Sequence, residues 1–277
     1  MSENPLAQRL SERQPLVMGI LNVTPDSFSD GGQFQSLDAA LRQTEIMVRG
    51  GADIIDIGGE STRPGARRPS QQEELDRVLP ILDGVQARFD VPISIDSSTP
   101  EVITACASRK VAMINDVRAL SIPGAVAAVG DFAVVALMHM QGTPESMQIS
   151  PHYRDLLGEI KDFFSRRIRV LESGGIDRQR VVLDPGFGFG KTPDQNFELT
   201  RGLSEFGDFG LPLMIGLSRK SSLRTVTDDI LIGSVAGALA AVAAGASLIR
   251  VHDVAATVSA LAVWKAIHDE GKERDGG

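Results

Sequence analysis

Short apolar runs that end in a polar residue recur along the chain, and a loop follows each run. The run from Val181 to Lys191, VVLDPGFGFGK, shows the pattern clearly, because β-branched residues give way to Asp184 and then to a glycine-rich loop. Apolar runs of this kind are typical of buried strands, and glycines let a backbone approach a ligand closely. Seven further runs end at Asn22, Glu60, Asp96, Asn115 with Asp116, His139, Lys220 and Asp253.

Segments with helix-like spacing separate these runs. Helices are expected over 36–49, 71–89, 123–129, 154–173 and 255–267. The uncharged stretch from Ile230 to Leu248 is as long as a membrane span, but it is rich in alanine and glycine, and Gly245 divides it into a buried helix and the last strand. Strands that alternate with helices in this way predict an α/β protein, a single (β/α)8 TIM barrel whose carboxyl strand ends face one mouth. We expect a polar segment over 1–15 and the barrel over 16–270.

Composition narrows the function. The chain has 277 residues and a formal net charge of −8, which argues against nucleic acid as a partner but allows a local basic pocket for a small anion. A single cysteine, Cys106, excludes an internal disulfide framework. Residues 1–15 lack the apolar core of a signal peptide. These features predict a cytoplasmic protein that binds neither nucleic acid nor membrane.

The polar residues at the predicted mouth divide into two groups. Asp96, Asn115 and Asp184 would match a heterocycle with adjacent ring N–H and amino donors, because a buried carboxylate is best satisfied by paired donors. Arg250 and His252, with a cation bound near the end of the first strand, would match an anionic group on the same substrate. The sequence has no histidine cluster with zinc spacing, and oxygen ligands favour magnesium. A bipolar pocket is therefore expected.

Other interpretations of these residues remain open. Asp184 could simply cap a turn at the end of its strand. The arginines of GESTRPGARRP, at positions 63, 67 and 68, could form a solvated basic loop. Lys220 could form a Schiff base with a carbonyl substrate, as lysines near barrel strand ends sometimes do. An aldolase is thus one alternative that the residues alone allow.

A family resemblance bears on this choice. The segments that carry it, in chain order, are MGILNVTPDSFSDGG, DIGGESTRPGA, ISID, IND, LMHMQG, LDPGFGFGK, SRKS and RVHDV. Together they resemble dihydropteroate synthase over nearly the whole chain. The resemblance implies condensation of 6-hydroxymethyl-7,8-dihydropterin diphosphate with 4-aminobenzoate in folate biosynthesis. It also implies a Mg²⁺ cofactor, a homodimer and competitive inhibition by sulfonamides.

The resemblance also implies residue roles. The matches to the pterin-binding set are Thr62, Asp96, Asn115, Asp184 and Lys220. The matches to the diphosphate-binding set are Asn22, which is also the implied magnesium ligand, Arg250 and His252. The matches on the aminobenzoate side are Phe28, Thr62, Arg63, Pro64, Phe189 and Ser218. The implied catalytic residues are Asp30, Lys220 and Arg250, with Asp30 and Phe28 in a loop that closes over the reacting centre.

The implied mechanism is dissociative. Diphosphate leaves with magnesium, a delocalised pterin cation is held, and the aniline nitrogen attacks without a strong base. One departure from the family follows SRKS, where SSLRTVTDDILIGS shortens the loop and Arg224 replaces the usual glycine. Two rival functions are a methyltetrahydrofolate-binding methyltransferase and a pterin-binding relative without catalysis. The former would not need the SRKS and RVHDV segments.

Overall fold

A computed structural model of the chain describes residues 4–12, 14–24, 33–61, 66–131, 133–144 and 146–268. All pairings between its strands are parallel, in the order β6-β5-β4-β3-β2-β1-β8-β7. The strands are β1 (Leu16–Asn22), β2 (Ile54–Gly58), β3 (Ile93–Asp96), β4 (Met113–Asp116), β5 (Val134–Met138), β6 (Val181–Asp184), β7 (Met214–Ile215) and β8 (Leu248–Val251). A parallel bridge between Leu183 and Leu213 joins the two edges and closes the barrel. The predicted (β/α)8 fold is confirmed.

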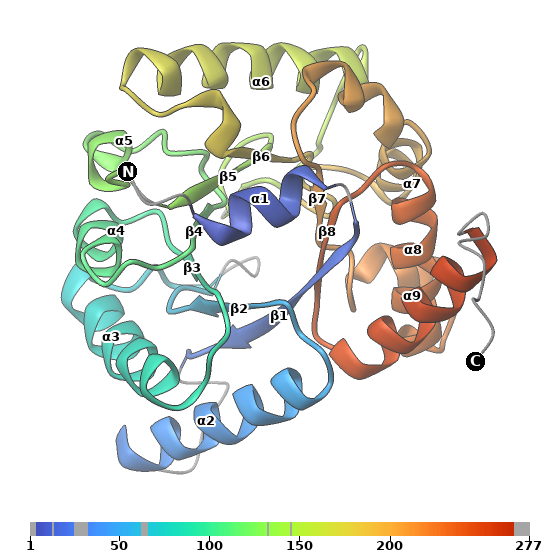
Figure 1. Ribbon diagram of the computed structural model, residues 1–277. Coiled ribbons are helices and arrows are strands. Elements are labelled where there is room, and N and C mark those ends of the chain that lie inside the picture. The colour runs from blue at the N-terminus through green and yellow to red at the C-terminus, as the bar shows by residue number, and fades with distance from the viewer. Residues whose placement is uncertain are drawn as a thin grey trace.

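Helices surround the sheet (Figure 1). They are α1 (Pro5–Ser11), α2 (Gln33–Arg49), α3 (Gln71–Arg88), α4 (Pro100–Ala107), α5 (Ala125–Ala128), α6 (Leu156–Ser173), α7 (Pro193–Arg201), α8 (Ile230–Ala243) and α9 (Val254–His268). Short 3-10 helices are η2 (Arg178–Arg180), η3 (Leu203–Phe209) and η4 (Ser221–Thr225). Capping boxes start α3 at Ser70 and α7 at Thr192, where each side chain accepts a backbone N–H of the first turn. The predicted helices are present with small shifts at their ends.

The uncharged stretch that could pass for a membrane span is divided as expected. Helix α8 ends at Ala243, and Gly245 adopts a positive φ of 103° before β8 begins. A glycine is favoured there because side chains strain this conformation. Among the described residues, no helix is long and apolar enough to cross a membrane.

The N-terminal segment contributes to the core, which its polar composition did not indicate. Helix α1 lies across the centre of the ring of strands in Figure 1. Its residues Leu6 and Leu10 are buried against apolar side chains from inside the barrel, among them Met18 and Met214. The boundary predicted at residue 16 stays a prediction, but α1 closes the amino-terminal end of the barrel.

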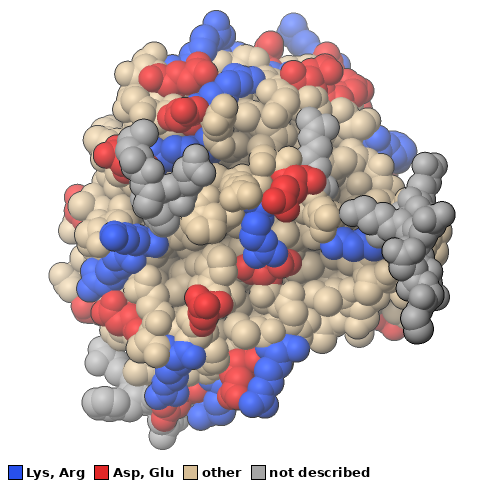
Figure 2. Space-filling model, in the orientation of Figure 1, with Lys and Arg blue, Asp and Glu red and all other residues tan. Residues whose placement is uncertain are grey.

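The net negative charge is not gathered on the face around α1. Figure 2 shows Lys and Arg side chains interspersed with Asp and Glu side chains over this face. Such mixed charge is typical of a solvated surface. In (β/α)8 barrels the active site lies at the opposite end, where the carboxyl-terminal ends of the strands meet.

Alternation along the strands fills the barrel in layers. Apolar residues such as Ile54 and Val182 form the lower interior cluster, whereas Ile55 and Leu183 pack outward against the helices. Because side chains alternate between faces, residues two and four positions further along also point inward. The polar residues at inward positions above the apolar layer are Asn22, Asp56, Ser94, Asp96, Asn115, Asp184, Arg250 and His252. The strands thus change from an apolar to a polar interior towards their carboxyl ends.

Candidate active site

Arg250 lies at the centre of the polar interior. Its Nε donates to Asp56 Oδ2 at 2.7 Å and its Nη2 donates to Asp96 Oδ2 at 2.8 Å. The Nδ2 of Asn115 also donates to Asp56 Oδ2, at 3.1 Å. The guanidinium group therefore links β8 to β2 and β3 across the barrel. The expected separation into an acidic side and a basic side is wrong in this respect, because Arg250 is inserted between the carboxylates.

Asp56 is a site residue that the sequence analysis missed. Its side chain is completely buried, and its Oδ1 has no hydrogen-bond partner among the described residues. An unsatisfied buried acceptor is costly and uncommon. The signal was present in IIDIG, where Asp56 has the same inward parity as Ile54. Asp56 lies inside the apolar run that ends at Glu60, so the pattern of polar strand ends does not identify it.

Glu60 serves a different contact. Its carboxylate forms a buried ion pair with Arg118, with 2.7 Å between Oε1 and Nη2. Arg118 Nη1 also donates to Ser98 Oγ at 3.0 Å, and Ser98 Oγ in turn donates to Asp116 Oδ1. This network joins the ends of β2, β3 and β4 beside the mouth. Glu60 therefore supports the rim and does not join the Arg250 cluster.

The ionisation of the mouth follows from its burial. Burial raises the pKa of Asp96 to about 8, although Arg250 opposes the shift, and it also raises the pKa of Asp184 against the effect of Lys220. Burial lowers the pKa of Lys220 to about 7, with Asp184 opposing. The carboxylates of Asp56, Asp96 and Asp184 thus share the buried interior with the basic groups of Arg250 and Lys220. With its pKa raised to about 8, Asp96 holds a proton near neutral pH.

Asp184 and Lys220 meet at the glycine-rich loop. Asp184 Oδ1 accepts the backbone N–H of Gly186 at 2.8 Å. Lys220 Nζ donates to the carbonyl of Phe187 and lies 4.4 Å from the centroid of the Phe189 ring. The strand β7 ends at Ile215, and Lys220 lies in the turn before η4.

Ser218 and His252 form a pair beside Arg250. Ser218 Oγ lies 3.1 Å from His252 Nδ1 and accepts the backbone N–H of His252 at 3.2 Å. Burial, reinforced by Arg250, lowers the pKa of His252 to about 4. The ring is therefore neutral near pH 7. If the Ser218 hydroxyl donates to Nδ1, the ring proton is on Nε2, which can then donate to an anion.

The two arginines nearest to Lys220 in the chain, Arg219 and Arg224, point away from the buried cluster. Arg219 Nε donates to Asp253 Oδ2 at 2.9 Å, in a solvent-exposed pair at the rim. Arg224 is exposed on η4, within the segment where the sequence departs from the family pattern. Neither arginine contributes to the buried cluster around Arg250.

Five of the residues implied by resemblance lie outside the described part of the chain. They are Phe28, Asp30, Thr62, Arg63 and Pro64. The structure brings the remaining ones together at the mouth. They are Asn22, Asp96, Asn115, Asp184, Phe189, Ser218, Lys220, Arg250 and His252.

The end of β1 offers oxygen to a hard cation. Asn22 Oδ1 and Asp96 Oδ2 lie 3.7 and 3.6 Å from the position that a Cβ of Gly58 would occupy. Two oxygens thus flank one glycine at the rim. Within the described ranges, no group of three or more His, Cys, Asp or Glu residues could hold a metal ion. Oxygen is the ligand type that Mg²⁺ takes in proteins, so Asn22 Oδ1 is the oxygen at this position that could contribute to such a site.

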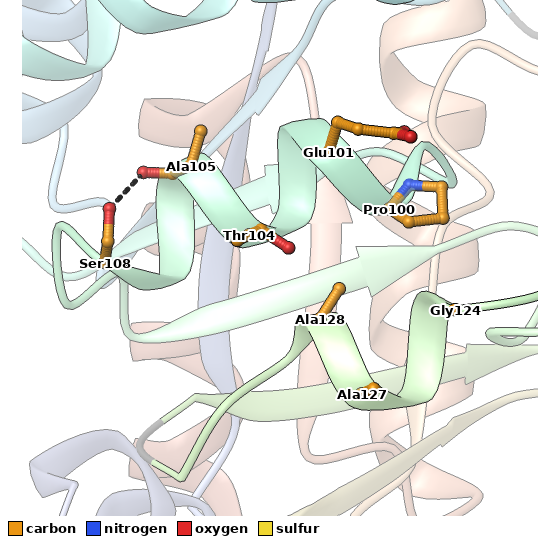
Figure 3. A pocket seen from close by; sticks show the side chains of 8 residues that line it. All are labelled: Pro100, Glu101, Thr104, Ala105, Ser108, Gly124, Ala127 and Ala128. Atoms are coloured by element: carbon orange, nitrogen blue, oxygen red, sulfur yellow. Dashed lines mark hydrogen bonds between the residues drawn. The ribbon is translucent and has the colours of Figure 1, made fainter.

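A cavity on the outer surface is separate from this site. It has a volume of about 540 Å³ and lies between α4 and α5. Figure 3 shows its lining, where Glu101 is the one ionisable residue and Ser108 bonds back to the carbonyl of Ala105. None of the residues at the mouth lines it. Its position and its polar content give it no part in the chemistry.

Comparisons with known proteins identify the family. A family model described as "Pterin binding enzyme" matches residues 18–252. Dihydropteroate synthase of Haemophilus influenzae is 49% identical over 257 residues, which cover 91% of this chain and 94% of that protein. The crystal structure of Yersinia pestis dihydropteroate synthase with a sulfonamide drug complex superposes with a TM-score of 0.88 at 49% identity, covering 93% of this chain and 95% of that one.

A second solved structure agrees. Dihydropteroate synthase of Xanthomonas albilineans with 4-aminobenzoic acid superposes with a TM-score of 0.87 at 46% identity, covering 93% of this chain and 94% of that one. The range of the family model, 18–252, includes every described residue of the mouth. The chain therefore belongs to the pterin-binding enzyme family, among the dihydropteroate synthases.

Proposed function

We propose that the chain condenses 6-hydroxymethyl-7,8-dihydropterin diphosphate with 4-aminobenzoate, giving 7,8-dihydropteroate and diphosphate in folate biosynthesis. The observation that carries this proposal is the inward-facing set of Asp96, Asn115, Asp184 and Arg250 at the carboxyl ends of four strands, in a chain of this family. One relative was solved with 4-aminobenzoic acid and another with a sulfonamide drug complex. By likeness, 4-aminobenzoate is the second substrate and sulfonamides compete with it.

The pterin ring is assigned to the carboxylate side. Asp96 and Asp184 would accept its ring N–H and amino donors, and Asn115 would add an amide donor and acceptor. Asp96 holds a proton near neutral pH when no ligand is bound, because burial raises its pKa to about 8. Donors from a bound pterin would favour the ionised form. Binding should therefore release a proton.

The diphosphate is assigned to Arg250, His252 and Asn22. His252 is neutral, and with its ring proton on Nε2 it would donate to the diphosphate, while Arg250 keeps its charge between Asp56 and Asp96. When bound, Mg²⁺ would neutralise part of the diphosphate charge, with Asn22 Oδ1 as its ligand from this chain. The arrangement holds the leaving group at the β1 and β8 side of the mouth.

The aminobenzoate is assigned to the glycine-loop side. Phe189 presents its ring against Lys220, and Ser218 lies in the turn that follows β7. Family likeness adds Phe28, Thr62, Arg63 and Pro64, which lie outside the described residues. An aromatic ring beside a lysine can stack on a flat substrate ring. The second substrate would thus approach along the side of Phe189 and Ser218, where Ser218 adjoins His252 of the diphosphate side.

The reaction we propose is dissociative. The bond between the pterin methylene carbon and the diphosphate oxygen breaks, the electron pair leaves with diphosphate, and the pterin cation is delocalised over its ring. The aniline nitrogen then attacks the methylene carbon and loses its proton to water. Arg250 stabilises the departing charge, whereas Asp30 and the carboxylates stabilise the cation. Lys220 supports the loop that carries Phe189, through its contacts with the Phe187 carbonyl and the Phe189 ring. The reaction needs no strong base.

We further propose a homodimer in a cytoplasmic location. Helices α8 and α9 pack against each other and expose apolar side chains, among them Ile232 at 63% and Val263 at 61%. Exposed apolar residues on neighbouring helices are suited to an isologous contact. The single cysteine fits a reducing compartment. Sedimentation of the protein and of an Ile232→Glu variant tests the dimer, since a monomeric wild type contradicts it.

The decisive experiment supplies both substrates. Purified protein is incubated with the pterin diphosphate, 4-aminobenzoate and Mg²⁺, and the products are separated to detect dihydropteroate and diphosphate. Formation of both, inhibited competitively by a sulfonamide, supports the assignment. A protein that instead transfers a methyl group from methyltetrahydrofolate, or binds pterin without turnover, refutes it. Borohydride trapping at Lys220 would reveal the Schiff-base alternative.

A further inference from the structure

The backbone carbonyls of the glycine-rich loop, residues 186–190, accept hydrogen bonds from side chains that lie outside this range. Lys191 Nζ donates to the carbonyl of Gly186 at 2.9 Å and to that of Phe189 at 3.0 Å. Gln148 Nε2 donates to the carbonyl of Gly188 at 3.0 Å, and Tyr153 OH donates to that of Gly190 at 2.7 Å. Lys220 Nζ donates a hydrogen bond to the carbonyl of Phe187. Every carbonyl from residue 186 to residue 190 therefore accepts a side-chain donor.

Lys191 is the buried member of this set. Only 2% of the residue is exposed, and its third contact is His139 Nδ1 at 3.1 Å. Burial lowers the pKa of Lys191 to about 7 and that of His139 to about 2. An ammonium can donate all three bonds, and a neutral amine can donate two while accepting from an Nδ1–H. The contacts to the two carbonyls are thus compatible with either charge state.

The loop is also confined by its glycines. Gly186 has a φ of 74°, and a Cβ there would lie 1.8 Å from the carbonyl oxygen of His139. Gly190 has a φ of 60°, and its Cβ would lie 2.5 Å from the carbonyl oxygen of Gln141. These approaches press the loop onto the segment after β5. The donors fix the loop along its length, while the glycines set its distance from that segment.

Asn196 adds a buried connection on the other side. This side chain of α7 accepts the N–H of Gly188 at 2.6 Å through Oδ1 and donates to Ser222 Oγ at 2.9 Å through Nδ2. The loop is thereby tied to η4, which directly follows Lys220. Movement of the loop would disturb both the Phe189 ring and the support of Lys220.

We propose that Lys191, Tyr153 and Gln148 form a carbonyl clamp that positions Phe189 for the aminobenzoate substrate. This inference rests on the proposed function for its substrate. The clamp acts on Phe189 more than on Asp184, because Gly186 is held in addition by Asp184 Oδ1 and by its packing against His139. The clamp residues are positioning residues that touch no substrate themselves.

The test compares Lys191→Met with Lys161→Met. Methionine keeps most of the length and apolar volume of lysine but donates no hydrogen bond. Lys161 lies on the surface of α6, where it donates to Glu205 at 3.1 Å. Lys191→Met should raise KM for 4-aminobenzoate about tenfold, equivalent to about 1.4 kcal/mol. The kcat and the KM for the pterin diphosphate should stay within about threefold, and Lys161→Met should resemble wild type.

Hydrogen exchange of the peptide over 185–192 supplies a readout independent of turnover. Exchange there should increase in Lys191→Met and not in Lys161→Met. If Lys191→Met does not fold, the double variant Tyr153→Phe, Gln148→Ala carries the same test, because both side chains act at the loop surface. An unchanged KM for aminobenzoate with unchanged loop exchange overturns the clamp, as does a loss of kcat without a change in KM. If wild type forms no dihydropteroate, the proposed function fails, and loop exchange alone decides the clamp.

Discussion

The contact of Arg250 with Asp56 and Asp96 yields a quantitative prediction. The three side chains are 20%, 0% and 14% exposed, so the guanidinium charge is largely shielded from water. Removing one partner of a buried ion pair costs about 3–5 kcal/mol, because it leaves an uncompensated charge. Arg250→Met should therefore lower the free energy of unfolding of the ligand-free protein by about that amount at pH 7.

A second substitution identifies the cause. Asp56→Asn alone should cost about 1.5–3 kcal/mol, because it removes a charge-assisted hydrogen bond. If charge pairing is the reason, adding Asp56→Asn to Arg250→Met removes the uncompensated carboxylate. The double variant should then be more stable than Arg250→Met. Simple additivity predicts the opposite, a double variant less stable than either single one.

The assay is urea unfolding of the four proteins, with m-values compared to exclude a change in cooperativity. Arg219→Met is the matched control, since its pair with Asp253 is exposed at 52% on the arginine side and should change stability by less than about 1 kcal/mol. A double variant that is the least stable of all would refute the reasoning. Arg250 would then stabilise the barrel through packing and not through its charge.

Three other outcomes are expected. Asp184→Asn should fold normally but bind the pterin at least about tenfold more weakly in isothermal titration, because charge-assisted hydrogen bonds contribute about 1.5–3 kcal/mol each. Unchanged affinity would show that Asp184 does not bind the pterin. Relative to Asp96→Asn, wild type without ligand should lose stability in urea as pH rises from about 5 to about 8. The folded pKa of Asp96, about 8, lies above its unfolded value, so the folded state keeps a proton that the unfolded state has released; parallel pH profiles would contradict this. In parallel titrations, aminobenzoate should bind more tightly by about 1–3 kcal/mol when Mg²⁺ and diphosphate are present. Asp30→Ala should reduce this coupling. Equal affinities with and without Mg²⁺ and diphosphate would exclude ordered binding.

Local patterns carried most of the fold. The apolar runs, their polar ends and the intervening helical spacing specified eight strands and the helices between them, because burial on one or both faces leaves a period in the sequence. The same patterns did not predict contacts made by residues that lie outside the periodic segments. Leu6 and Leu10 stand in a polar segment, yet α1 packs them into the barrel end. Strand β7 is shorter than its apolar run.

The site was predicted unevenly for a related reason. Asp96, Asn115 and Asp184 end their strands and were found, since strand ends of a barrel share one mouth. Asp56 lies two residues before the end of β2, so the pattern of polar strand ends did not identify it. It follows Ile54 by two positions, and alternation therefore predicts that its side chain also points inward. Lys191 looked like the end of a motif, and its burial against His139 could not be foreseen, because it depends on how two loops pack.

The sequence by itself determined which residues face the interior and at which end of the barrel they gather, because alternation and chain order are local properties. Only the tertiary structure decided which of them meet. Arg250 and Asp56 are 194 residues apart in the chain, and they meet because β1 pairs with β2 on one side and with β8 on the other. Side-chain partners across a closed sheet depend on strand stagger and on the competition of several carboxylates for one cation, which no short stretch of sequence encodes.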